Sequence, residues 1–73
     1  MKYALVLFVY SLVGTPELIH QEELPIEYPT YYDCVSDGYI TSYSEVMRAG
    51  RQIVEDKKIA ITFQCKPQNS VWK

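Results

Sequence analysis

The most apolar segment of the chain is its N-terminal run, Ala4 to Val13, which follows a basic start at Met1-Lys2. The run has the outline of a secretory signal, but cleavage after Gly14 or Thr15 would leave a large aliphatic residue where a small one is needed. It is also far shorter than the roughly 20 apolar residues of a membrane span. A continuous run rich in Val, Phe and Tyr is typical of a β-strand buried on both faces. We therefore predict a retained central strand, with a cleaved signal as the alternative.

A more polar segment follows the turn that begins at Gly14. Residues 17–24 alternate only loosely between apolar and charged positions. This pattern suits an exposed edge strand, because charges there discourage pairing with other chains. Pro25 and Pro29 predict a connector over residues 25–29, since proline has no backbone N–H to donate.

Residues 31–56 repeat apolar or small side chains at steps of three and four, which is the period of a helix. The stripe consists of Tyr32, Val35, Tyr39, Tyr43, Val46, Gly50 and Ile53, widened by Ile40, Met47 and Val54. Thr30 is the predicted N-cap, with Asp33 completing a variant of the capping box. Because the stripe keeps its phase across Gly38, we predict one long amphipathic helix with this stripe on the core. The alternative is a break at Asp37-Gly38 and a new start at Ser42.

The last regular segment, residues 59–65, alternates cleanly, with Ile59, Ile61, Phe63 and Cys65 on one face. Lys66-Pro67 ends this strand, and residues 68–73 are expected to form a loose tail. The order strand, strand, helix, strand predicts a small α+β domain over residues 1–67. We expect a three-stranded antiparallel sheet with the N-terminal strand in the centre and the long helix across one face.

The N-terminal strand has two apolar faces, and a single helix covers only one of them. One face carries Ala4, Val6, Phe8, Tyr10 and Leu12, and the other carries Tyr3, Leu5, Leu7, Val9 and Val13. Large exposed apolar patches usually mark interfaces. Tyr28 and Tyr31 lie off the helical stripe and form a candidate aromatic contact patch, with boundary packing as the alternative reading. The predicted interface therefore consists of Tyr3, Leu5, Leu7, Val9, Tyr28 and Tyr31, and it would contact a second copy in a homodimer or a larger assembly.

Two cysteines, Cys34 and Cys65, are expected at neighbouring ends of the helix and the last strand. A helix and a strand joined by a short turn run antiparallel. At a crossing angle of about 40°, the part of the helix after Cys34 extends ~25 Å along the direction of the strand, and residues 59–65 of the strand extend ~20 Å. The similar lengths place the two cysteines near each other. We favour a disulfide, which would contribute ~3–4 kcal/mol, over two buried free thiols. A disulfide implies an oxidising compartment or a virion, whereas free thiols are consistent with a host cytoplasm.

The length and the charge of the chain limit the kinds of partner that it can bind. The chain has 73 residues, of which 48% are hydrophobic and 22% charged, so it is long enough for one domain with a thin core. Its formal net charge of −2 gives no concentrated positive field, and we expect no nucleic-acid partner. Membrane contact is expected only if the N-terminal run is a signal.

No motif for catalysis, a cofactor or a metal is present. His20 is the only histidine and lies among glutamates on the predicted edge strand, where a solvated side chain is expected. Two distant cysteines with one histidine do not match a zinc site. The three glycines do not cluster into a phosphate-binding loop. We therefore predict a non-enzymatic protein without catalytic residues, cofactor or metal.

Across most of its length the chain resembles small uncharacterised proteins encoded by bacteriophages, especially those of marine bacteria. The resemblance rests on the short Met-Lys start, the apolar run ending at Gly14-Thr15-Pro16, and the positions of Cys34 and Cys65. It implies a small accessory protein that acts by protein–protein interaction or self-assembly. The alternatives are a structural virion component of the capsid-decoration type, and a secreted or periplasmic disulfide-stapled domain.

Overall fold

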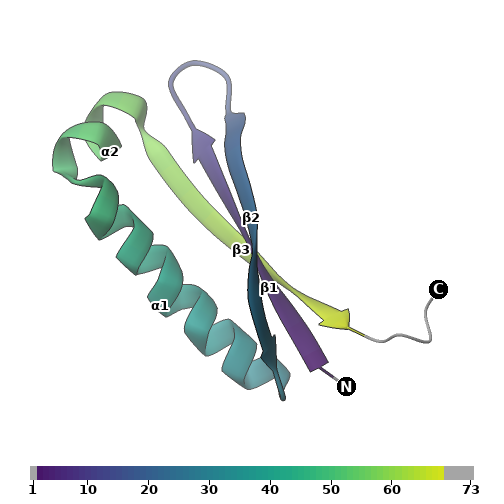
Figure 1. Cartoon of the computed structure of the whole chain (residues 1–73). Helices are drawn as coiled ribbons and strands as arrows, with labels where there is room; N and C mark the ends of the chain where they lie inside the picture. The colour runs from purple at the N-terminus through teal and green to yellow at the C-terminus, as the bar shows by residue number, and fades with distance from the viewer. Residues whose placement is uncertain (1, 69–73) are drawn as a thin grey trace.

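The computed structural model describes residues 2–68 as one sheet with helices on one side (Figure 1). The elements in chain order are β1 (Lys2–Ser11), β2 (Glu17–Tyr28), α1 (Tyr31–Ala49), α2 (Arg51–Lys57) and β3 (Ile59–Gln68). The strands form an antiparallel sheet in the order β2-β1-β3. The predicted α+β class, the three-stranded antiparallel sheet and the central N-terminal strand are confirmed. Apart from Gln68, which belongs to β3, the predicted tail lies outside the described residues.

Strand β1 is central because its apolar run tolerates burial on both faces. It pairs with β2 on one side and with β3 on the other. The stretch Ala4–Leu7 is buried, and Leu5 and Leu7 are among the largest fully buried side chains of the described chain. The N-terminal run thus supplies most of the apolar core.

The two outer strands are longer than the sequence pattern predicts. The expected connector over residues 25–29 is wrong, because β2 continues through Pro25 to Tyr28. Its pairing with β1 shifts register twice, and three residues between Glu23 and Glu27 lie opposite Leu5. An outer strand tolerates proline in such an irregularity, since the missing N–H faces away from the ladder or falls in a bulge. Strand β3 likewise runs past Lys66-Pro67 to Gln68.

The helical segment begins and ends with recognisable caps. The Thr30 side chain accepts a hydrogen bond from the Asp33 backbone N–H at 3.1 Å, which confirms the predicted N-cap. The helix then runs without a break across Gly38 and Ser42, so the alternative of a second start there is wrong. At the other end, Lys58 adopts the left-handed conformation that closes α2.

The prediction of one long helix is also wrong, because the helix breaks at Gly50. This residue has φ 89° and ψ 158°, outside the helical region, and it separates α1 from α2. Glycine adopts positive φ without the Cβ penalty that other residues pay. The element order is therefore β-β-α-α-β.

The face that α1 turns to the sheet is made of small residues. Cys34 and Gly38 are its buried positions, and a Cβ built on Gly38 would lie 2.5 Å from the ring of Phe63. Leu5, Tyr28 and Cys34 form the centre of the core, with Phe63 and Cys65 packed against it. The absence of bulk at positions 34 and 38 lets the helix backbone approach the sheet closely, and it turns the predicted apolar stripe away from the core.

Candidate interaction surface

The residues predicted to form an exposed sheet face instead point toward α1. Leu5 pairs with Cys65 and Leu7 with Phe63, and residues paired across antiparallel strands share a face. Leu5, Leu7 and Tyr28 are 0%, 2% and 8% exposed, respectively. The expected assignment of the two faces of β1 is therefore reversed. The position of the helix explains the reversal. Cys34 of α1 lies against Cys65, which shares a sheet face with Leu5 of β1.

The remaining predicted interface residues lie at the edges of this packed layer. Val9 is half-buried in β1, and Tyr3 packs against the core. The rings of Tyr3 and Tyr31 meet edge to face with centroids 5.6 Å apart, and Tyr31 stays exposed. Boundary packing thus accounts for Tyr3, whereas the interface role of Tyr31 stays a prediction.

Tyr28 holds the end of β2 against α1. Its hydroxyl donates a hydrogen bond to the Asp37 carboxylate. Burial of the ring, together with this hydrogen bond and the negative charge of Asp37, raises the pKa of Tyr28 from 10.0 to about 12. The pair is a structural link between strand and helix, and the deprotonated form of Tyr28 is disfavoured there.

The structure places the two cysteines as predicted. Cys34 and Cys65 have Cα atoms 6.1 Å apart and sulfur atoms at disulfide distance, across a sequence separation of 31. Cys34 is fully buried and Cys65 is half-buried at the core edge. Such a link joins the start of α1 to the far part of β3, opposite the turn that connects α2 to β3.

The largest aromatic surface of the described chain is the outer side of α1. Tyr32, Tyr39 and Tyr43 are 78%, 68% and 66% exposed, and Ile40 and Met47 are exposed beside them. We call these five residues the aromatic face of α1. They recur at steps of four and seven, so they line one side of the helix. The prediction that this stripe packs into the core is wrong.

A signal in the sequence points to the true core side of α1. Cys34, Gly38 and Ser42 recur at intervals of four, which places three small residues in a row along one side of the helix. A row of small residues permits close approach of another element, whereas a row of tyrosines does not. This row of small residues is a weaker pattern than the apolar stripe on the opposite side of the helix.

The sheet face opposite α1 is not an apolar patch. Ala4 and Val6 lie on it, yet both are buried. The register sets Glu27 and Lys66 on either side of Ala4, and Glu23 and Gln64 on either side of Val6. Long polar side chains cover small neighbours with their methylene groups while their heads stay in water. The surplus apolar surface of this protein is therefore on the helix rather than on the sheet.

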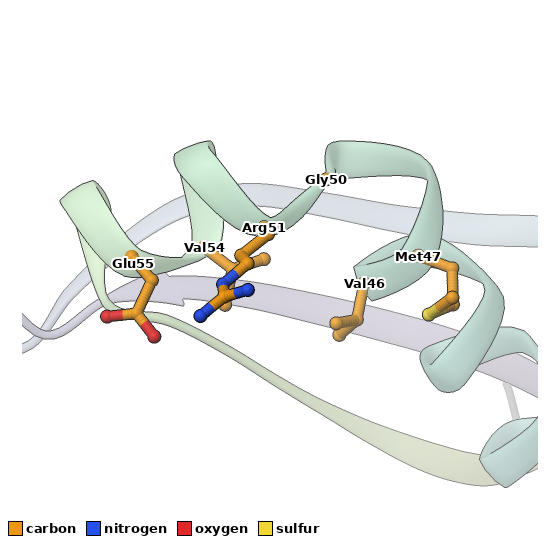
Figure 2. Close-up of a pocket in the computed structure, with 6 residues that line it drawn as sticks. All are labelled: Val46, Met47, Gly50, Arg51, Val54 and Glu55. Atoms are coloured by element: carbon orange, nitrogen blue, oxygen red, sulfur yellow. The ribbon is translucent and has the colours of Figure 1, made fainter.

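Two shallow hollows flank α1. One, of about 300 Å³, lies along the seam with β3 and is lined by Tyr39, Ser42, Ile61, Thr62 and Phe63. The other, of about 290 Å³, lies under the break between α1 and α2. Figure 2 shows its lining residues, Val46, Met47, Gly50, Arg51, Val54 and Glu55. Its lining combines aliphatic side chains with one arginine and one glutamate.

Residues 2–68 carry neither a membrane-spanning helix nor a cluster of metal ligands. None of the helices there is long and apolar enough to cross a membrane. His, Cys, Asp and Glu side chains of the same residues form no group of three suited to a metal ion. His20 lies exposed on β2, 3.5 Å from a carboxylate oxygen of Glu22.

Comparison of the chain with protein-family models, with curated proteins and with solved structures found no match.

Proposed function

We propose that this chain is a small non-enzymatic protein that acts by protein–protein interaction, with the aromatic face of α1 as its binding surface. The observation that carries the proposal is the exposure of Tyr32, Tyr39 and Tyr43 along one side of the helix. This surface takes the place of the sheet face expected from the sequence.

The chemistry of the face supports this role. Tyrosine offers a large contact area with few rotatable bonds, and it is enriched among residues that dominate binding energy. Each tyrosine ring system has about 200 Å² of surface. At the observed exposures the three tyrosines present roughly 400 Å², about half of the ~800 Å² that each partner buries in a standard interface. Ile40 and Met47 add to this area.

The aromatic face of α1 carries no charged side chain. The positions on this side of α1 are 32, 36, 39, 40, 43 and 47, and serine at 36 is the only small polar residue among them. Charged residues such as Glu45 and Arg48 lie on other sides of the helix. Depletion of charge at the centre of a patch is the compositional mark of an interface core.

The resemblance to small phage-encoded proteins supplies a biological setting for the proposal. An accessory protein of this size would act by binding a host factor or by assembling with itself. Neither role requires a catalytic residue, cofactor or metal.

A photocrosslinking experiment tests the binding surface. A benzophenone amino acid replaces Tyr43 in the full chain expressed in cells, and the matched control carries it at Ser44, the exposed neighbour on the polar side of α1. We expect discrete crosslinked protein species from position 43 and few or none from position 44. Equal crosslinking at both positions, or none at position 43, would contradict the proposal.

A second candidate, a structural component of an extracellular particle, is favoured by the Cys34–Cys65 pair. A covalent link between helix and strand suits a small domain outside the reducing cytoplasm. The test is the intact mass of the chain recovered from purified particles after alkylation of free thiols. An unalkylated, oxidised chain in the particles supports this role, and absence of the chain from the particles contradicts it.

A further inference from the structure

The two edges of the sheet differ in how well they are protected against pairing. Strand β2 carries two register irregularities, Pro25 and several glutamates, all of which discourage edge-to-edge association. Strand β3 keeps an unbroken register with β1 over its whole length. It has no charged residue between Ile59 and Cys65. The free edge of β3 is therefore open to another strand.

The orientation of the backbone makes this edge usable. The Leu12 N–H donates a hydrogen bond to the Lys58 carbonyl at 3.0 Å, just beyond the end of the β1–β3 ladder. Hydrogen-bonded pairs alternate along an antiparallel ladder. The even-numbered residues of β3 therefore bond to β1, and the N–H and C=O groups of Ile59, Ile61 and Phe63 point to the free edge.

Pro67 is consistent with this alternation. Its odd number places its ring nitrogen at the free edge, where it costs no hydrogen bond to β1. It also ends the stretch that accepts a new strand. The usable edge is thus about seven residues long, from Ile59 to Cys65, or roughly 23 Å.

The free edge and the aromatic face of α1 belong to one continuous surface. The Tyr39 ring meets the Phe63 ring edge to face, with centroids 5.0 Å apart. The hollow at the seam between α1 and β3 lies between the two features and shares these residues. A partner strand placed along β3 would therefore bring neighbouring side chains against this hollow and the adjoining tyrosines.

We infer that the occupant of this surface is a second copy of the chain, joined by antiparallel pairing of β3 with the β3 of its partner. The inference rests on the proposed function and names the partner of that surface. A twofold axis perpendicular to the sheet would pair the two free edges and keep both α1 helices on the same face. The β3-side flanks of the two helices then face each other, in an isologous interface.

The charge pattern leaves the centre of such a pairing free of repulsion. The paired stretch, Ile59 to Cys65, and the aromatic face of α1 contain no charged residue, so two copies bring no like charges together there. At the two ends, a pairing centred on Thr62 sets Lys58 of each copy opposite Lys66 of the other, where both side chains are exposed to solvent. The monomer also has a thin core, with six buried apolar residues within residues 2–68. Self-association is a common way for a domain of this size to bury more apolar surface.

Amide hydrogen exchange combined with sedimentation tests the inference on the purified full chain. We expect a species of twice the 8.5 kDa chain mass that dissociates on dilution. In the dimer the Ile61 and Phe63 amides are protected, and this protection is lost on dilution to the monomer. The Thr62 and Gln64 amides, paired to β1, stay protected in both states.

A pair of matched variants adds a second line of evidence. Phe8 lies opposite Thr62 on β3 and opposite Gln21 on β2, so both residues occupy the same row on opposite edges. Thr62→Lys brings two like charges close together at the centre of the dimer, and we expect the dissociation constant to rise about two- to fivefold. Gln21→Lys adds the same charge at the other edge and is expected to leave it unchanged.

The outcomes separate the two proposals. A monomer at all concentrations, or equal effects of the two lysine variants, overturns the second-copy inference and leaves the crosslinking test of the helix face intact. A dimer with Ile61 and Phe63 amides unprotected overturns edge pairing. Failure of the crosslinking test together with a protected β3 edge would overturn only the role of the aromatic face.

Discussion

Reduction of the Cys34–Cys65 pair is the perturbation that bears most directly on the stability of this fold. The pair closes a loop with a sequence separation of 31. In the chain-entropy model, a link across such a loop lowers the entropy of the unfolded chain by about 12 cal/mol/K, or about 3.7 kcal/mol at 25 °C. A 73-residue chain has a total stability of roughly 4–11 kcal/mol. Reduction is therefore expected to remove a third or more of the free energy of unfolding.

Equilibrium urea unfolding, followed by circular dichroism, measures this loss. The oxidised chain is compared with the same chain reduced in denaturant and refolded under a phosphine reductant. A loss of about 3.7 kcal/mol at a slope near 1 kcal/mol/M is expected to lower the urea midpoint by about 3.7 M. The double variant Cys34→Ala/Cys65→Ala is the control, and the reductant should leave its midpoint unchanged. An unchanged midpoint for the wild-type chain, or alkylation of both cysteines without reductant, would contradict a stabilising disulfide.

Three further predictions concern the core. A Cβ at position 38 would lie 2.5–2.8 Å from three ring carbons of Phe63, so the Gly38→Val side chain clashes with the ring. We expect this variant to lower the free energy of unfolding in urea by about 2–3 kcal/mol. Unchanged stability would show that the ring moves aside freely. The raised pKa of Tyr28 favours its protonated form in the folded state, so its contribution is complete below pH 10 and is lost between pH 10 and 12. Tyr28→Phe should not show this loss of about 2–3 kcal/mol at alkaline pH. The variant should be less stable than the wild-type chain at neutral pH, because the Asp37 carboxylate loses its hydrogen-bond donor. Equal alkaline sensitivity of both chains would contradict the link between Tyr28 and this loss. A chain lacking residues 1–14 should show no cooperative thermal unfolding, because β1 carries Leu5 and Leu7 and pairs with both other strands; a cooperative transition would argue that the rest of the chain folds alone.

The class of the fold and the place of its central strand follow from the pattern of apolar residues alone. A run of ten residues with only one polar member, Ser11, has no stable position in a small domain except between two neighbouring strands, and this predicts β1 in the middle of the sheet. The clean alternation over residues 59–65 and the N-cap at Thr30 are local properties, and both are confirmed. The spacing of Cys34 and Cys65 also predicts that they meet, because a helix and a strand joined by a short turn run antiparallel. The structure places the two cysteines together.

Which face of α1 meets which face of β1 depends on packing between segments that are distant in sequence. Both sides of β1 are apolar, so either could face the helix. Helix α1 has a stripe of tyrosines on one side and a row of small residues on another, and local periodicity favours the bulkier stripe as the core side. Packing reverses this choice, because close contact at Gly38 and the link at Cys34 require the small side of the helix against Phe63 and Cys65. The tyrosines are thereby left on the surface. Their exposure depends on the contacts of residues distant in sequence, and the local pattern indicates it only through the weaker row of small residues Cys34, Gly38 and Ser42.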